Sequence, residues 1–195
     1  LHKEYRRQRQ MCIRDRGIPL TAAWQRDNRD SALVPTKGRY QRANFEISPA
    51  GDSNYYRATY QHQYFQPLFG SSTLALNGEI NYGKGLGGKT YPIFKNFYGG
   101  GIGSVRGYES SSLGPKASNG DPLGGSSRII LNAELQFPFP GSGIDRSLRW
   151  FTFLDAGNVY ADGFGGSLKA SAGVGLSWVS PVSYTHLRAH ETSLH

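Results

Sequence analysis

Apolar and polar residues alternate along most of the chain, which is the pattern of β-strands that present two different faces. Four segments alternate most clearly: 56–64, 73–82, 128–137 and 168–179. Three other segments show the same tendency less cleanly: 18–27, 40–48 and 148–160. The pattern predicts an all-β fold with about seven antiparallel strands of roughly 9–12 residues each.

Strand length and aromatic content favour a transmembrane β-barrel over a soluble β-sandwich or a lipocalin-like barrel. Strands of roughly 9–11 residues cross a bilayer when tilted, whereas strands of soluble proteins are usually about 5–6 residues long. Tyr and Trp lie near the strand ends of the apolar faces, as they do in the aromatic girdles of membrane barrels. The charged residues Glu79, Glu134 and Lys169 all avoid the apolar faces. We therefore predict apolar faces toward lipid and polar faces toward a wet lumen.

About seven strands do not close a bacterial outer-membrane barrel, which needs an even number of at least about eight. Unpaired strand edges are not tolerated in lipid. We therefore expect an incomplete barrel, with strands missing before residue 17 and after residue 181.

The two ends of the chain differ in composition from its body. Residues 1–16 hold six Lys or Arg against two acids, and four of the five histidines and Cys12 lie in 1–16 or 182–195. We interpret both ends as non-native tails, of the kind produced by translated adapter sequence, and assign the barrel to 17–181. No basic stripe continues into this body, so the net charge of +8 does not indicate a nucleic-acid partner.

Residues 83–127 form a long interruption between two clean strands. The segment carries aromatic residues that we expect to anchor it: Tyr91, Phe94, Phe97, Tyr98 and Tyr108. We predict that it folds into the barrel lumen. Alternation places Glu134 and Asp155 on inward faces of neighbouring strands, and the guanidinium of Arg106 suits bidentate carboxylate contacts. We expect Arg106 to pair with one or both acids and to fix the loop tip to the wall.

Several motifs give the body a family resemblance. Residues 91–116, with Val105-Arg106-Gly107-Tyr108 at their centre, resemble the lumen-inserted sixth extracellular loop of the BamA family of outer-membrane barrel assembly factors. The segment FTFLDAGNV matches that family's Phe-x-Asp-x-Gly strand, here Phe153, Asp155 and Gly157. Three shorter matches are NRDSALVPTKG at 28–38, NAELQFP at 132–138 and WVSP at 178–181.

The resemblance implies that these strands are about the eighth to fourteenth of sixteen. It implies a Gram-negative outer-membrane protein that folds and inserts nascent β-barrel client proteins into the lipid bilayer. It also implies accessory Bam-type lipoproteins, held by periplasmic POTRA domains that this chain lacks. The fixed loop would either only stiffen the barrel or set the shape needed for gating and insertion, and both readings stay open.

Four alternatives remain: a TamA-like translocation and assembly factor, a two-partner secretion transporter, a passive porin and an outer-membrane enzyme. An enzyme such as a phospholipase would need a Ser–His pair, and His62 is the single histidine of the body. Residues 83–90, GKGLGGKT, match the phosphate-loop pattern, but an alternating strand precedes them and no helix is expected after them. We expect no bound cofactor or metal and no enzymatic activity.

Overall fold

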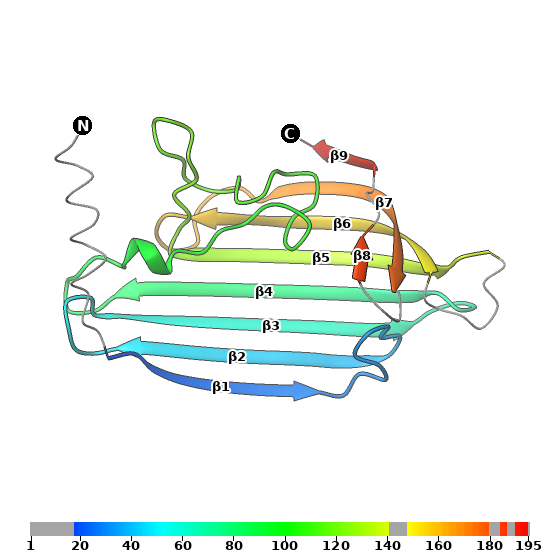
Figure 1. Ribbon diagram of the computed structural model, residues 1–195, viewed down its shortest axis with the longest axis horizontal. Helices are drawn as coiled ribbons and strands as arrows, with labels where there is room; N and C mark the ends of the chain where they lie inside the picture. Colours follow the sequence, from blue (N-terminus) through cyan, green and yellow to red (C-terminus); the bar gives the residue numbers. More distant parts are fainter. Residues whose placement is uncertain (1–17, 141–147, 180–183, 187–189, 195) are drawn as a thin grey trace.

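The computed structural model describes residues 18–140, 148–179, 184–186 and 190–194, and these form one antiparallel sheet in which consecutive strands lie side by side (Figure 1). Seven strands lie within residues 17–181: β1 (Leu20–Asp27), β2 (Gly38–Ser48), β3 (Tyr55–Pro67), β4 (Thr73–Gly85), β5 (Ser127–Pro138), β6 (Leu148–Tyr160) and β7 (Lys169–Val179). The predicted all-β antiparallel fold is confirmed. Each predicted strand is present, with its ends within a few residues of the expected positions.

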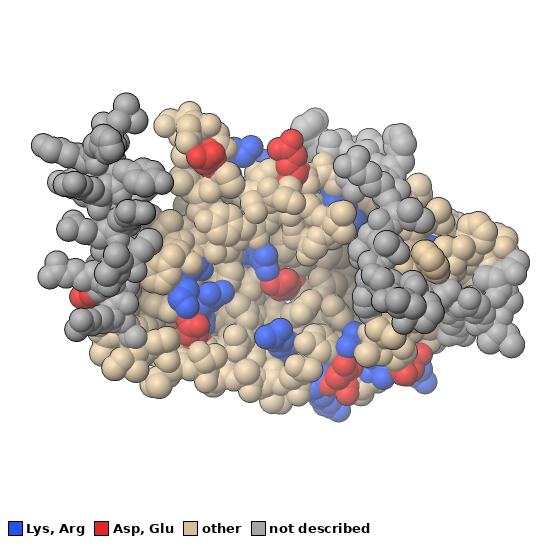
Figure 2. Space-filling view, viewed as in Figure 1, with Lys and Arg blue, Asp and Glu red and all other residues tan. Residues whose placement is uncertain are grey.

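The sheet has an apolar outer face and a polar inner face, as the alternation predicted. Large apolar side chains are exposed on the outer face: Trp24, Phe45, Tyr60, Leu76, Ile80, Leu131, Trp150, Leu154, Val174, Leu176 and Trp178. Polar and charged side chains gather on the face that carries the β4–β5 loop (Figure 2). A soluble sandwich would bury its apolar faces, so this distribution fits strands that face lipid.

Aromatic rings line both ends of the outer face. At the end of the short β3–β4 turn, Phe137 stacks on Trp150 with ring centroids 4.2 Å apart and lies 6.4 Å from Phe69. At the opposite end, the ring of Tyr82 lies 5.9 Å from that of Phe164. Such paired rings match the two aromatic girdles of membrane barrels.

The β4–β5 loop, residues 86–126, lies against the inner face of the sheet (Figure 1). One short 3-10 turn, η1 (Ile93–Lys95), is its regular element. A small dry core forms where the loop meets β5 and β6, and it consists of Val105, Leu113, Ile130 and Val159. The expectation that Phe94 anchors the loop is wrong, because its side chain is 63% exposed, whereas Phe97 is buried.

The end segments 1–16 and 182–195 lie largely outside the described residues. Two short strands, β8 (Tyr184–His186) and β9 (His190–Leu194), pair with β7. The non-native origin of both ends stays a prediction. Among the described residues, no helix is long and apolar enough to cross a membrane.

Candidate functional site: the loop tip on the inner wall

A tight turn presents Arg106 at the tip of the loop. The backbone N–H of Ser104 donates to the carbonyl of Gly101, and the N–H of Gly101 donates to the carbonyl of Val105. Gly107 follows with φ +86°, a left-handed conformation that glycine adopts without the steric penalty of a Cβ. The Arg-Gly sequence therefore lets the chain reverse directly after the arginine.

Arg106 contacts both carboxylates that the sequence suggested as its partners. Its Nε donates to Asp155 Oδ2 at 2.7 Å and its Nη2 donates to Asp155 Oδ1 at 2.8 Å, which is a bidentate pair. The backbone N–H of Arg106 also donates to Asp155 Oδ2, at 3.0 Å. Nη1 donates to Glu134 Oε2 at 2.8 Å. We call Arg106, Glu134 and Asp155 the tip clamp.

The tip clamp is enclosed by aromatic rings. The side chain of Asp155 is 0% exposed, that of Arg106 13% and that of Glu134 20%. The guanidinium carbon lies 3.8 Å from the ring centroid of Phe153, so the motif phenylalanine supports the arginine through a cation–π contact. Burial acts to lower the pKa of Arg106, but hydrogen bonds to Asp155 and Glu134 outweigh it and raise that pKa.

The neighbouring motif residues bring loop and wall into close contact. A Cβ at Gly157 would lie 2.6 Å from the carbonyl oxygen of Ile129 and 2.9 Å from a methyl of Val105. Val105 itself is fully buried in the dry core. Tyr108 packs against the same core and donates its hydroxyl to the carbonyl of Ala170 on β7. The Val-Arg-Gly-Tyr tip thus touches three consecutive strands.

Strand register explains why the two acids converge. Glu134 of β5 pairs with Phe153 of β6, and Asn132 pairs with Asp155, so both carboxylates flank the same aromatic ring on the inner face. Asn132 Nδ2 also donates to the carbonyl of Ser104 at 2.7 Å. Gln136 Nε2 donates to Glu134 Oε1, which leaves the other oxygen of Glu134 for Arg106.

Sequence reasoning missed a second attachment at the base of the loop. Lys95 forms a 2.8 Å ion pair with Glu46 on the inner face of β2, and Glu46 accepts a hydrogen bond from the Tyr55 hydroxyl. Tyr91 donates its hydroxyl to the carbonyl of Lys95 and packs edge-on against Tyr55. We call Glu46, Tyr55, Tyr91 and Lys95 the base contact. The sequence offered one signal for this contact: alternation within 40–48 places Glu46 on the inner face, where it needs a partner of opposite charge.

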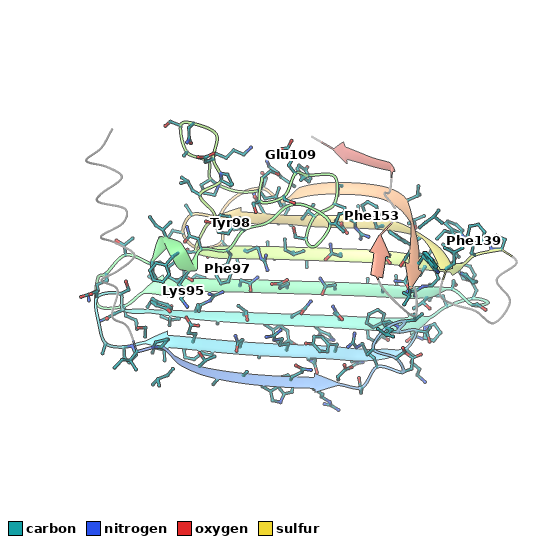
Figure 3. The ribbon with its side chains drawn as sticks, viewed as in Figure 1. Lys95, Phe97, Tyr98, Glu109, Phe139 and Phe153 are labelled. Atoms are coloured by element: carbon teal, nitrogen blue, oxygen red, sulfur yellow. The ribbon has the colours of Figure 1, made fainter. Side chains whose placement is uncertain are left out.

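Figure 3 shows Lys95 and Phe97 together at this end of the loop, while Phe153 lies beneath the tip farther along the sheet. Burial acts to lower the pKa of Lys95, but its hydrogen bonds with Glu46 and Tyr55 outweigh that effect and raise the pKa. Burial raises the pKa of Tyr91 to about 12. Raising the pH far into the alkaline range therefore removes protons from Lys95 and Tyr91 and weakens the base contact.

The arrangement is suited to holding a loop against the inner wall of the sheet. His62 belongs to the outer face of β3, whereas Ser104 lies in the loop on the inner face, so the two cannot form a nucleophile–base pair. Within the described part of the chain, no group of three or more His, Cys, Asp or Glu side chains is arranged to hold a metal.

Comparisons with known proteins agree with this geometry. The family model described as the Omp85 superfamily domain matches residues 13–187. The outer membrane protein assembly factor BamA of Neisseria meningitidis is 39% identical, over 83% of this chain and 24% of its own length. The mouse sorting and assembly machinery component 50 homolog is 31% identical, over 74% of this chain and 32% of its own length.

A solved structure shows the same arrangement of strands. The crystal structure of BamA from Haemophilus ducreyi lacking POTRA domains 1–3 superposes with a TM-score of 0.76 and 26% identity. The match covers 84% of this chain and 36% of that one. The chain thus spans about a quarter of the Neisseria relative and about a third of the Haemophilus structure.

Proposed function

The chain belongs to the Omp85 superfamily, and on that basis we propose that the protein containing it folds and inserts β-barrel proteins into the outer membrane. Relatives that match most of this chain are named as an outer membrane protein assembly factor and as a component of a sorting and assembly machinery. An outer-membrane location follows from the family and accords with the apolar outer face between two aromatic girdles.

The tip clamp is the observation that carries the proposal. It fixes a loop of the lumen to β5 and β6 through one arginine, two acids and a dry core. Because burying a charge is unfavourable unless it is paired, the fully buried carboxylate of Asp155 favours the docked position of Arg106 over other positions of the loop. We propose that the clamp holds the wall in the shape required for insertion.

In the proposed mechanism, the protein acts on its client through the shape of the barrel and through binding. The inner wall keeps the loop docked while the barrel presents an openable seam and a locally thinned bilayer to the incoming strands. The seam would lie in strands beyond β1–β7. Nascent β-barrel proteins are the proposed clients, Bam-type lipoproteins bound through periplasmic domains are the proposed partners, and no covalent catalysis is involved.

The experiment that tests the proposal replaces Arg106 by Ala in the full-length protein. Proteoliposomes with this variant should assemble a client barrel more slowly, as followed by the heat-dependent gel mobility of the client. Arg42→Ala is the matched control, because Arg42 is an inward-facing arginine of β2 outside the tip clamp. Undiminished client assembly by Arg106→Ala in a correctly folded barrel would contradict the proposal.

We also propose that residues 1–16 and 182–195 are not native. Replacing them with the genomic sequence of the source organism should leave the pairing of β1–β7 unchanged. Genomic sequence that contains both ends in frame would contradict this assignment.

A further inference from the structure

A row of polar side chains interrupts the apolar outer face on β1, β2 and β3. Arg26 pairs with Gln41, and Gln41 pairs with His62, so the three residues lie next to one another across the strands. They share the face of Trp24, Phe45 and Tyr60, because side chains two residues apart along a strand point to the same side. Arg39 lies beside the row, opposite Tyr64.

The row shortens the apolar band on this side of the sheet. On β5 the outward apolar residues run from Ile129 to Phe137, about 27 Å along the strand. On β2 they run from Ala43 to Ile47, about 13 Å. The apolar band of membrane barrels is about 25 Å tall, so hydrocarbon matched to β5 would also cover the polar row.

Several polar groups of the row have no hydrogen-bond or ion-pair partner among the described residues. Gln41 Nε2 donates to the Tyr60 hydroxyl at 3.0 Å, while Nε2 of His62 is buried without a hydrogen-bond partner among the described residues. The Arg26 side chain is exposed and contacts no described carboxylate, and the Arg39 guanidinium lies 5.3 Å from the Tyr64 ring centroid without a described acid beside it. Two guanidinium groups thus lie on the outer face without an ion pair to any carboxylate of the described residues.

The position of the polar row along the strands indicates which leaflet of the membrane lies beside it. Arg26 and Arg39 lie beside the turn that joins β1 to β2, at the same end as the short β3–β4 turn. The long β4–β5 loop leaves the sheet at the opposite end (Figure 1). Outer-membrane barrels have short turns on the periplasmic side and long loops outside, so the row belongs to the inner leaflet.

We propose that Arg26 and Arg39, together with Gln41 and His62, bind the phosphate headgroup of an anionic phospholipid of the inner leaflet. Adjacent strands lie about 4.8 Å apart, so side chains from β1 and β2 can reach one phosphate group. Guanidinium groups suit phosphate oxygens because they donate two parallel hydrogen bonds. A headgroup drawn toward the row would bring the hydrocarbon boundary into line with the shorter apolar band.

Trp24 offers a local reporter, because it lies two residues from Arg26 on the same face and is half exposed. The test uses the full-length protein with Trp150, Trp178 and any tryptophan outside this chain replaced by Phe. The protein is placed in two sets of phosphatidylcholine vesicles. One set contains brominated phosphatidylglycerol and the other contains the same fraction of brominated phosphatidylcholine. We expect the anionic lipid to be preferred beside Trp24 by about fivefold for each contributing arginine. Brominated phosphatidylglycerol should therefore quench the Trp24 fluorescence more strongly than brominated phosphatidylcholine does.

Matched variants decide the outcome. Arg26→Gln with Arg39→Gln should reduce the preference to about one, whereas Arg26→Lys with Arg39→Lys should retain it. Arg42→Gln, on the same strand but the opposite face, should leave it unchanged. A preference that survives the double glutamine variant, or that Arg42→Gln abolishes equally, would overturn the proposal. So would displacement of the brominated lipid by lipopolysaccharide but not by unlabelled phosphatidylglycerol. Because none of these outcomes depends on client assembly, they are distinct from a failure of the proposed function.

Discussion

Two ion-paired attachments, the tip clamp and the base contact, hold the loop to the wall, and they differ in burial and in the number of bonds. At the tip, Arg106 makes three side-chain hydrogen bonds to two acids, one of which is fully enclosed. At the base, Lys95 makes a single ion pair with Glu46, and their side chains are 25% and 17% exposed. Both use an opposite-charge pair, but water competes more strongly at the base. The difference predicts that the tip dominates the stability of the docked loop.

Asp155→Asn should give the largest effect, because it leaves the Arg106 guanidinium enclosed with only Glu134 as an anionic partner. Removing one partner of a buried ion pair costs about 3–5 kcal/mol. The heat or urea midpoint of barrel unfolding in the full-length protein measures the loss. Glu46→Gln is the matched change at the base, and equal losses for the two variants would contradict the ranking.

Gly157→Ala should come next. The added methyl would meet the Ile129 carbonyl and the side chains of Val105 and Ile130, and overpacking of this kind costs about 1–3 kcal/mol. Gly103→Ala is the control, since a Cβ there would meet nothing within 4 Å. The same unfolding midpoints report both changes. A neutral Gly157→Ala would contradict the close packing of β5, β6 and the loop around Gly157.

Lys95→Met should have a smaller effect, about 0.2–1 kcal/mol, because a partly exposed ion pair is screened by water. Its influence should be local. Hydrogen exchange should become faster at Tyr91–Phe97 backbone amides and stay unchanged around Arg106. Faster exchange at both places would mean that tip and base undock together.

Raising the pH should weaken the base contact while the tip clamp stays intact, so the two attachments can be told apart without any mutation. The pKa of Tyr91 is raised to about 12 from its ordinary value of about 10, so its stabilising contribution is complete below about pH 10 and is lost as pH rises through 12. Lys95, whose pKa is also raised, adds a loss in the same direction. Arg106 remains charged, so the tip should stay docked.

The unfolding midpoint between about pH 10 and about pH 12 checks this expectation. Tyr91→Phe removes the hydroxyl and should make the midpoint less dependent on pH than in the unchanged protein. Identical pH profiles for the two proteins would exclude a contribution from Tyr91.

Strands and faces could be read from the sequence because a period of two residues is a local property. The inward direction of Glu134 and Asp155 followed from that period alone, and a guanidinium was the evident partner for two lumen acids. The base contact could not be found in this way, since it joins Lys95 to a residue 49 positions away through a loop without periodicity. Phe94 was misjudged for the same reason, because hydrophobicity in an irregular loop does not specify which rings turn inward.

Arg106 precedes its two partners by 28 and 49 residues along the chain. The clamp therefore closes only after two later strands have formed and paired. A slip of one residue between β5 and β6 would turn one carboxylate to the outside, because neighbouring side chains on a strand face opposite ways. The contacts of Arg106 thus stabilise the observed alignment of β5 and β6 relative to alignments shifted by one residue.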